Sequence, residues 1–120
     1  MTLVDTINVL LAFATIGFGS AGWLVPKWTM QKVGLADTGT TMGMSEVRAA
    51  SGALFVMAGA AALVLAHPIA YAMLGFVWLG GGLGRGTSLL VDGRTRRKWG
   101  FFASEVVIGL TLIILNLQGA

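Results

Sequence analysis

Four charged side chains lie within or beside otherwise apolar stretches of the chain: Glu46, Arg48, Arg85 and Glu105. On membrane-insertion scales, an arginine at the centre of a spanning helix costs about 2.5–3.5 kcal/mol, so each such group needs a partner or a route to the membrane surface. Carboxylates and guanidinium groups in this setting can bind an anionic headgroup or a carboxylate substrate, carry a proton, or hold helices together as an ion pair. These four residues form the predicted intramembrane charge cluster.

Depth along the helices indicates which of these charges can meet. Arg85 precedes Val91 by six residues, and Glu105 follows Trp99 by six. At about 1.5 Å of rise per residue, both lie roughly 9 Å from the same ends of two adjacent antiparallel helices. Arg85 and Glu105 are therefore the predicted pair.

The other two charges are expected beside this pair. Arg48 begins an apolar stretch, and a cation at a helix N-terminus opposes the helix dipole, so it is expected to approach Glu105. Glu46 cannot pair locally with a residue two positions away and is placed at the edge of the cluster. The cluster is interpreted as a lock on helix order and register. A ligand or proton site, and unpaired side chains that snorkel to the interface, are the alternatives.

Glycines shape the segment that carries Arg85. At 100° per residue, Trp78 and Arg85 lie on one stripe of the helix with Gly81 and Gly82 between them, so the four residues define a candidate pocket for a lipid, a quinone or a pigment tail. Glycine stripes more often admit a neighbouring helix. Helix packing is predicted for five glycines: Gly52, Gly59, Gly75, Gly82 and Gly86.

Composition places these residues in a membrane. Of the 120 residues, 56% are hydrophobic and only 11% are charged, against about 25% charged in soluble domains. A span needs about 20 apolar residues. The sequence predicts one all-α domain over 1–120, a four-transmembrane-helix antiparallel bundle with short loops. The predicted spans lie near 3–25, 47–66, 69–91 and 101–117.

The longest connection, 26–44, contains the mildly amphipathic segment 28–33 and could carry a short interfacial helix. Ser45 is the predicted N-cap of the second span, with Glu46 in its first turn. The dipeptide His67-Pro68 leaves room only for a tight turn between antiparallel helices.

Basic residues set the predicted orientation. Six of the eight lysines and arginines lie in the segments 26–44 and 92–98, and Arg48 and Arg85 lie near the same side. The positive-inside rule places these segments in the cytoplasm and both termini on the other side of the membrane. The first span has no basic segment before it and is expected to be retained rather than cleaved.

Several kinds of chemistry find no support in the sequence. With no cysteine and a single histidine, His67, no metal site, catalytic residues or cofactor is predicted. No serine has a histidine base at helical spacing. The basic cluster at 94–98 is a loop between spans rather than the face of a soluble module, so nucleic-acid binding is not expected.

Short motifs spread along the chain resemble a family. The segments Glu46–Gly52, Gly84-Arg85, Asp92-Gly93 and Glu105–Gly109 are similar to those of a bacterial family of small four-helix membrane proteins described only as a domain of unknown function. That family's pattern has a glycine pair after its Glu-x-Arg element, whereas here Ala53 follows Gly52. The resemblance implies the four-span fold and marks the charge cluster as signature positions, without implying an activity.

The expected function is therefore non-catalytic. The chain is expected to be an accessory or assembly subunit, or a scaffold, that contacts membrane lipids and associates with a larger membrane complex or with further copies of itself. The alternative is a protein that binds or transports a lipid, a quinone or a small anion at the site around Arg85. An enzyme is the third and least favoured class.

Overall fold

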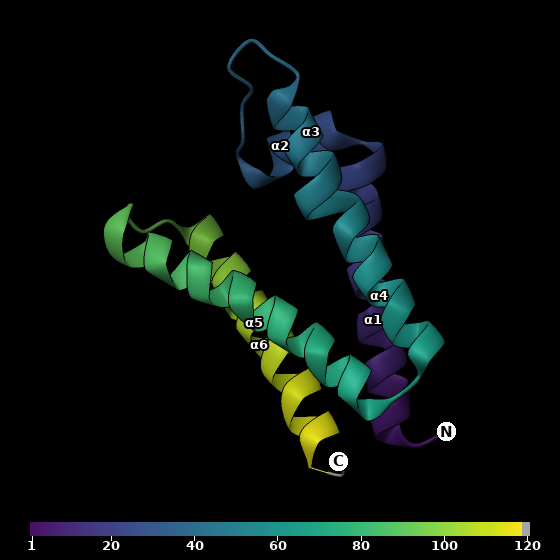
Figure 1. Ribbon diagram of the computed structural model, residues 1–120. Coiled ribbons are helices and arrows are strands. Elements are labelled where there is room, and N and C mark those ends of the chain that lie inside the picture. The colour runs from purple at the N-terminus through teal and green to yellow at the C-terminus, as the bar shows by residue number, and fades with distance from the viewer. Residues whose placement is uncertain (119–120) are drawn as a thin grey trace. The chain divides into compact units, whose positions relative to one another are not determined.

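The computed structural model describes residues 1–118, and over these residues it contains helices and connecting turns but no strand (Figure 1). The all-α prediction is therefore confirmed. The helices, in chain order, are α1 (Leu3–Leu24), α2 (Pro26–Val33), α3 (Met42–Arg48), the π-helical segment η1 (Ala49–Ala53), α4 (Leu54–Leu65), α5 (Pro68–Val91) and α6 (Arg96–Leu117).

Three helical stretches are long and apolar enough to cross a membrane within the described residues: Leu3–Leu24, Met42–Leu65 and Arg96–Leu117. The sequence predicts four. The predicted span that is not among them is α5, which has 24 residues and is therefore long enough. Arg85 and the glycine-rich run around it lower the apolar character of α5.

The second stretch begins earlier than predicted. α3, η1 and α4 follow one another without a break from Met42 to Leu65, whereas the sequence places the start of this span near residue 47. Thr41 is the N-cap, and the backbone N–H of Ser45 donates to its carbonyl oxygen at 3.0 Å, which is the first hydrogen bond of the helix. The prediction of Ser45 as N-cap is therefore wrong, and Glu46 lies beyond the first turn.

The last helix also begins earlier than predicted. α6 starts at Arg96 rather than near residue 101, because the side chain of Thr95 caps it by accepting a hydrogen bond from the Lys98 backbone N–H at 3.1 Å. Three of the four basic residues assigned to the loop therefore lie in the first turn of α6. The Lys98 ammonium reaches back to the carbonyl oxygen of Gly93 at 3.0 Å and so ties the two ends of the connection together.

The segment between the first two long stretches contains the expected short helix. α2 begins at Pro26, which suits the first helical position because its missing N–H would have no partner there. The helix ends at Gly34, whose φ of 82° is the left-handed conformation that glycine adopts easily. Met30 is buried and most of the rest of α2 is exposed.

The chain forms two compact units. One combines Met1–Asn8 with Leu65–Ala120 and contains α5 and α6; the other, Val9–Val64, contains most of α1 together with α2, α3, η1 and α4. In the first unit α5 and α6 lie side by side as an antiparallel hairpin (Figure 1). Gly75 faces Gly109 at the closest approach of the two helices, where a Cβ added to Gly75 would lie 2.8 Å from the Gly109 carbonyl oxygen.

Candidate functional site

Arg85 and Glu105 form an ion pair between α5 and α6. The Arg85 Nε donates to Glu105 Oε1 at 3.0 Å, and the guanidinium also lies over the Phe101 ring, with its Cζ 5.1 Å from the ring centroid. The Glu105 side chain is only 13% exposed, while that of Arg85 is 40% exposed. Glu105 is thus the inner member of the pair, and Arg85 extends from it toward the surface of the hairpin.

Glycine makes room for this ion pair. A Cβ added to Gly81 would overlap Oε2 of Glu105, and one added to Gly82 would lie 2.9 Å from Cγ2 of Val106. The gap that the sequence places between Trp78 and Arg85 is therefore filled at least in part by side chains of α6. Trp78 itself is buried. The candidate pocket of Trp78, Gly81, Gly82 and Arg85 is thus, on the α6 side, a packing surface.

Arg48 belongs to the other unit and bonds to α1. Its Nη1 donates to the carbonyl oxygen of Trp23 at 2.6 Å, near the C-terminus of α1. Pro26, three residues after Trp23, has no backbone N–H to donate to a carbonyl oxygen of the preceding turn. The predicted contact of Arg48 with Glu105 would join the two units and stays a prediction. Glu46 is exposed and makes no ion pair within residues 1–118.

All five glycines predicted to pack helices lie at helix contacts. The contacts of Gly75 and Gly82 are described above. A Cβ added to Gly52 would lie 2.7 Å from the backbone nitrogen of Trp23. Gly59 lies against Ala12. The fifth, Gly86, faces Phe102. Three further glycines of this kind were not singled out from the sequence: Gly19, Gly22 and Gly109.

The closest of these contacts coincides with η1. Gly52 has φ −119° and ψ −105°, which departs from helical geometry and marks a local widening of the helix. A Cβ on Gly22 would lie 2.5 Å from the Ser51 carbonyl oxygen, and one on Gly19 would lie 2.6 Å from that of Gly52. The backbones of α1 and η1 therefore touch directly, as small residues permit in membrane helices.

A buried amide pair is the polar contact between helices that the sequence did not predict. Asn8 and Asn116 exchange two hydrogen bonds of 2.7 Å, and the Asn116 Nδ2 also donates to the Leu112 carbonyl oxygen at 2.7 Å. Both side chains are almost fully buried. The sequence does contain an indication of this pair. Asn8 and Asn116 lie in the first and last apolar helices, and a buried amide needs a hydrogen-bonding partner.

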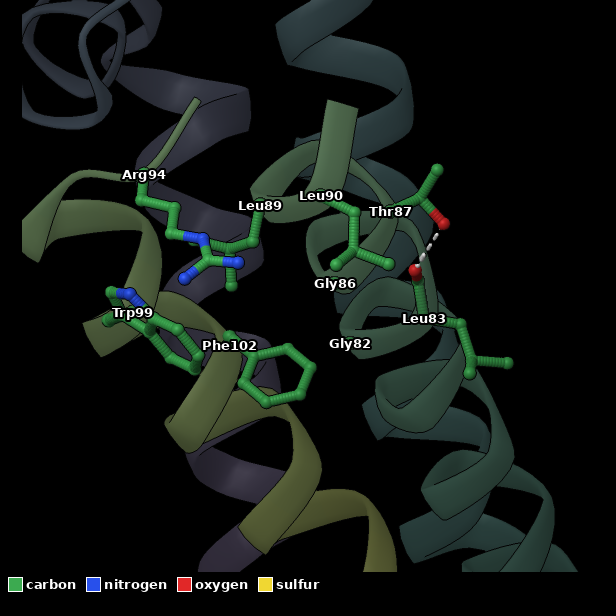
Figure 2. Close-up of a pocket in the computed structure, with 9 residues that line it drawn as sticks. All are labelled: Gly82, Leu83, Gly86, Thr87, Leu89, Leu90, Arg94, Trp99 and Phe102. Carbon is green, nitrogen blue, oxygen red and sulfur yellow. Dashed lines mark hydrogen bonds between the residues drawn. The ribbon is translucent and has the colours of Figure 1, made fainter. Parts of the chain in front are cut away.

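A groove lies on the hairpin next to the charge pair. It has a volume of about 440 Å³ and is lined by residues of α5, of the connection and of α6, including Gly82, Gly86, Arg94, Trp99 and Phe102 (Figure 2). Its lining is mainly apolar, with one guanidinium at the end formed by the connection. It shares only Gly82 with the predicted pocket and was not foreseen.

The described residues contain no group of three or more histidine, cysteine or acidic side chains that could hold a metal ion. The polar contacts of the long helices include a charge pair, an amide pair and an arginine-to-carbonyl bond. Together with three helices able to cross a membrane, these contacts define the class of the protein: an all-helical chain suited to a membrane, with its internal polar groups placed at helix contacts.

The chain belongs to a family described as a domain of unknown function (DUF4345), whose model matches residues 4–116. The resemblance to a family of unknown function is thereby confirmed, and it covers nearly the whole chain. Comparison with curated proteins and with solved structures finds no match.

Proposed function

We propose that the chain is a non-catalytic membrane protein that serves as an accessory or assembly subunit, or as a scaffold, beside a larger membrane complex or further copies of itself. One observation carries this proposal: polar side chains of the long helices bond to one another or to the backbone. Arg85 bonds to Glu105, Asn8 to Asn116, and Arg48 to a backbone carbonyl. Groups that bond in this way serve helix packing and leave little chemistry for a substrate.

The proposal includes four spans, with α5 as the third, in a bacterial inner membrane. With 24 residues and about 1.5 Å of rise each, α5 is longer than the roughly 30 Å of a hydrocarbon core. The basic residues support this count. If α5 did not cross, the segments 26–44 and 92–98 would lie on opposite sides, and the lysines and arginines would be divided between the two faces. With four crossings both basic segments are cytoplasmic, and both termini lie outside.

Photocrosslinking in native membranes tests the proposed association. A photoreactive amino acid is placed singly at highly exposed apolar positions outside the groove, such as Val64, Met73 and Val107, with the fully buried Leu112 as the matched control. We expect a saturable crosslink to one protein, or to a second copy, from a subset of the exposed positions and none from Leu112. A chain that crosslinks only to lipid and elutes as a monomer in mild detergent would contradict the proposal.

The second proposal is binding or transport of a lipid, a quinone or a small anion. Transport through Arg85 and Glu105 has less support, because these two groups neutralise each other at 3.0 Å. Binding has the groove on the hairpin in its favour. A structure in native lipid with density for a ligand beside Trp78 and Arg85 would favour the pocket predicted from the sequence over this groove.

A further inference from the structure

Two glycines of α5 are among the residues that line the groove on the α5–α6 hairpin. Gly82 and Gly86 lie one turn apart on α5, and a Cβ added to Gly86 would come 3.1 Å from Cε1 of Phe102. On α6, the rings of Phe102 and Trp99 meet edge to face, with centroids 5.8 Å apart and planes at 88°. Gly86 thus lets Phe102 pack close to α5, and the aromatic pair of Phe102 and Trp99 forms a wall of the groove (Figure 2).

The remaining lining presents little polarity to an occupant. The only hydroxyl, that of Thr87, donates to the carbonyl oxygen of Leu83 at 2.9 Å in its own helix (Figure 2). It is therefore already bonded, and the threonine methyl and Leu90 complete an apolar lining. The volume of about 440 Å³ falls within the range of roughly 300–1,000 Å³ that is typical of small-molecule sites.

One end of the groove carries positive charge. Arg94 lines it, is exposed, and makes no hydrogen bond or ion pair within residues 1–118. Arg96 and Arg97 follow after Thr95 and are also exposed. Lys98 is different, because its ammonium bonds to the carbonyl oxygens of the connection. Asp92, the acid in this connection, forms no ion pair there in the described part of the chain.

We propose that this groove binds an anionic phospholipid, with an acyl chain along Leu83, Leu90 and Phe102 and the phosphate on Arg94. A guanidinium can bond to two phosphate oxygens at once, which favours a phosphate over the neutral ring of a quinone. Trp99 suits the same location, since tryptophans gather at the level of the headgroups. This site is separate from Arg85 and Glu105. It goes beyond the scaffold role, and it rests on the second proposal above, for which it names the class of lipid.

Quenching by lipids with brominated tails tests the site. The purified full chain is placed in bilayer discs of phosphatidylcholine, and phosphatidylglycerol or phosphatidylcholine with brominated acyl chains is added in steps. The signal of Trp99 is taken as the difference between the wild-type chain and W99F. We expect Trp99 quenching to reach half its maximum at about fivefold less brominated phosphatidylglycerol than phosphatidylcholine, as one phosphate-contacting cation near a membrane surface would give.

Variants separate the headgroup contact from the acyl contact. Arg94→Gln should abolish the preference for phosphatidylglycerol, whereas the matched control Arg96→Gln, which removes the same charge outside the groove, should retain most of it. Thr87→Phe should reduce quenching by both lipids, while Gly84→Phe, at a position with open space around it, should not. Circular dichroism checks that each variant keeps its helices.

Four outcomes would overturn the proposal. These are equal quenching by the two lipids in the wild-type chain, equal effects of Arg94→Gln and Arg96→Gln, unchanged quenching in Thr87→Phe, and displacement of brominated phosphatidylglycerol by inorganic phosphate alone. The last result would indicate a simple anion site without an acyl chain. None of the four bears on the proposed association with a protein partner, which the crosslinking experiment tests separately.

Discussion

The Arg48 guanidinium bonds to the carbonyl oxygen of Trp23 at 2.6 Å, beside the closest approach of α1 and η1. Trp23 lies in the last turn of α1, and Pro26 interrupts the backbone hydrogen bonds that would continue this helix. Thr29 serves the same junction, since its hydroxyl donates to the Ala21 carbonyl oxygen at 2.7 Å. A cation at a helix C-terminus also interacts favourably with the negative end of the helix dipole. Arg48 thus fastens the end of α1.

Removing this cation should destabilise the chain. Arg48→Met leaves the Trp23 carbonyl without its donor, and a lost hydrogen bond from a charged group costs about 1.5–3 kcal/mol. Arg48→Lys should cost less, because an ammonium can still donate. The measurement is the free energy of unfolding in mixed micelles with increasing SDS, followed by circular dichroism. Arg96→Met is the control, since Arg96 has no bonding partner within residues 1–118. An equal loss in Arg48→Met and Arg96→Met would exclude this role.

The close approach of α1 and η1 should tolerate no added methyl group. In Gly22→Ala the new Cβ would lie 2.5 Å from the Ser51 carbonyl oxygen, so the helices must separate, at a cost of about 1–3 kcal/mol. Gly17→Ala is a matched control in the same helix, with open space around it, and should be neutral or stabilising by about 0.5–1 kcal/mol. The same unfolding measurement compares them. Similar free energies for the two variants would show that the contact does not form.

Much of the α5–α6 hairpin could be predicted from the sequence because helix geometry is regular. Counting about 1.5 Å per residue puts Arg85 and Glu105 at one depth, and they bond. The same regularity identifies Gly75 and Gly82 as packing positions. The sequence predicts an open pocket at Gly81, because helix geometry describes one helix at a time. In the structure, the side chain of Glu105 from α6 occupies the space beside Gly81.

Other features depend on contacts that periodicity does not contain. The π-helical segment at Ala49–Ala53 departs from the regular helix, so no 100° projection reveals it, and it lies where Arg48 bonds to α1. The pairing of Asn8 with Asn116 joins residues 108 positions apart. The sequence did not predict the start of α6 at Arg96, because basic residues in a first turn interact unfavourably with the helix dipole. In the structure α6 nevertheless begins there, with the side chain of Thr95 as its N-cap.

Exchange of charges tests the ion pair. Arg85→Glu and Glu105→Arg each replace the ion pair with two like charges and should each destabilise the chain by about 2.5–3.5 kcal/mol, the scale of placing an unpaired charge in a membrane helix. The double variant should recover a large part of this loss, because the opposite charges are restored. The unfolding free energies of all four chains give the coupling energy. A double variant no more stable than the single ones would rule out direct pairing.

The amide pair should show a smaller coupling. Asn8→Leu or Asn116→Leu leaves a buried amide with fewer partners, which costs about 1–3 kcal/mol. The coupling energy from the double-mutant cycle should be near 0.6 kcal/mol, as is usual between membrane helices. The Asn116→Leu variant should be the worse of the two, because Asn116 also bonds to the Leu112 carbonyl. Strict additivity of the two substitutions would exclude an interaction.

The proposed four spans can be mapped with single cysteines, because the natural chain has none. Cysteine at Ala36 or Asp92 should react with a membrane-impermeant maleimide only after the cytoplasmic side is opened, and cysteine at His67 or Gln118 should react in intact cells. The buried Ala62 is the control that should react only after denaturation. Asp92 decides the count: if α5 did not cross, Asp92 and Ala36 would be labelled from opposite sides. The basic residues after Asp92 would then lie outside the cytoplasm, against the positive-inside rule.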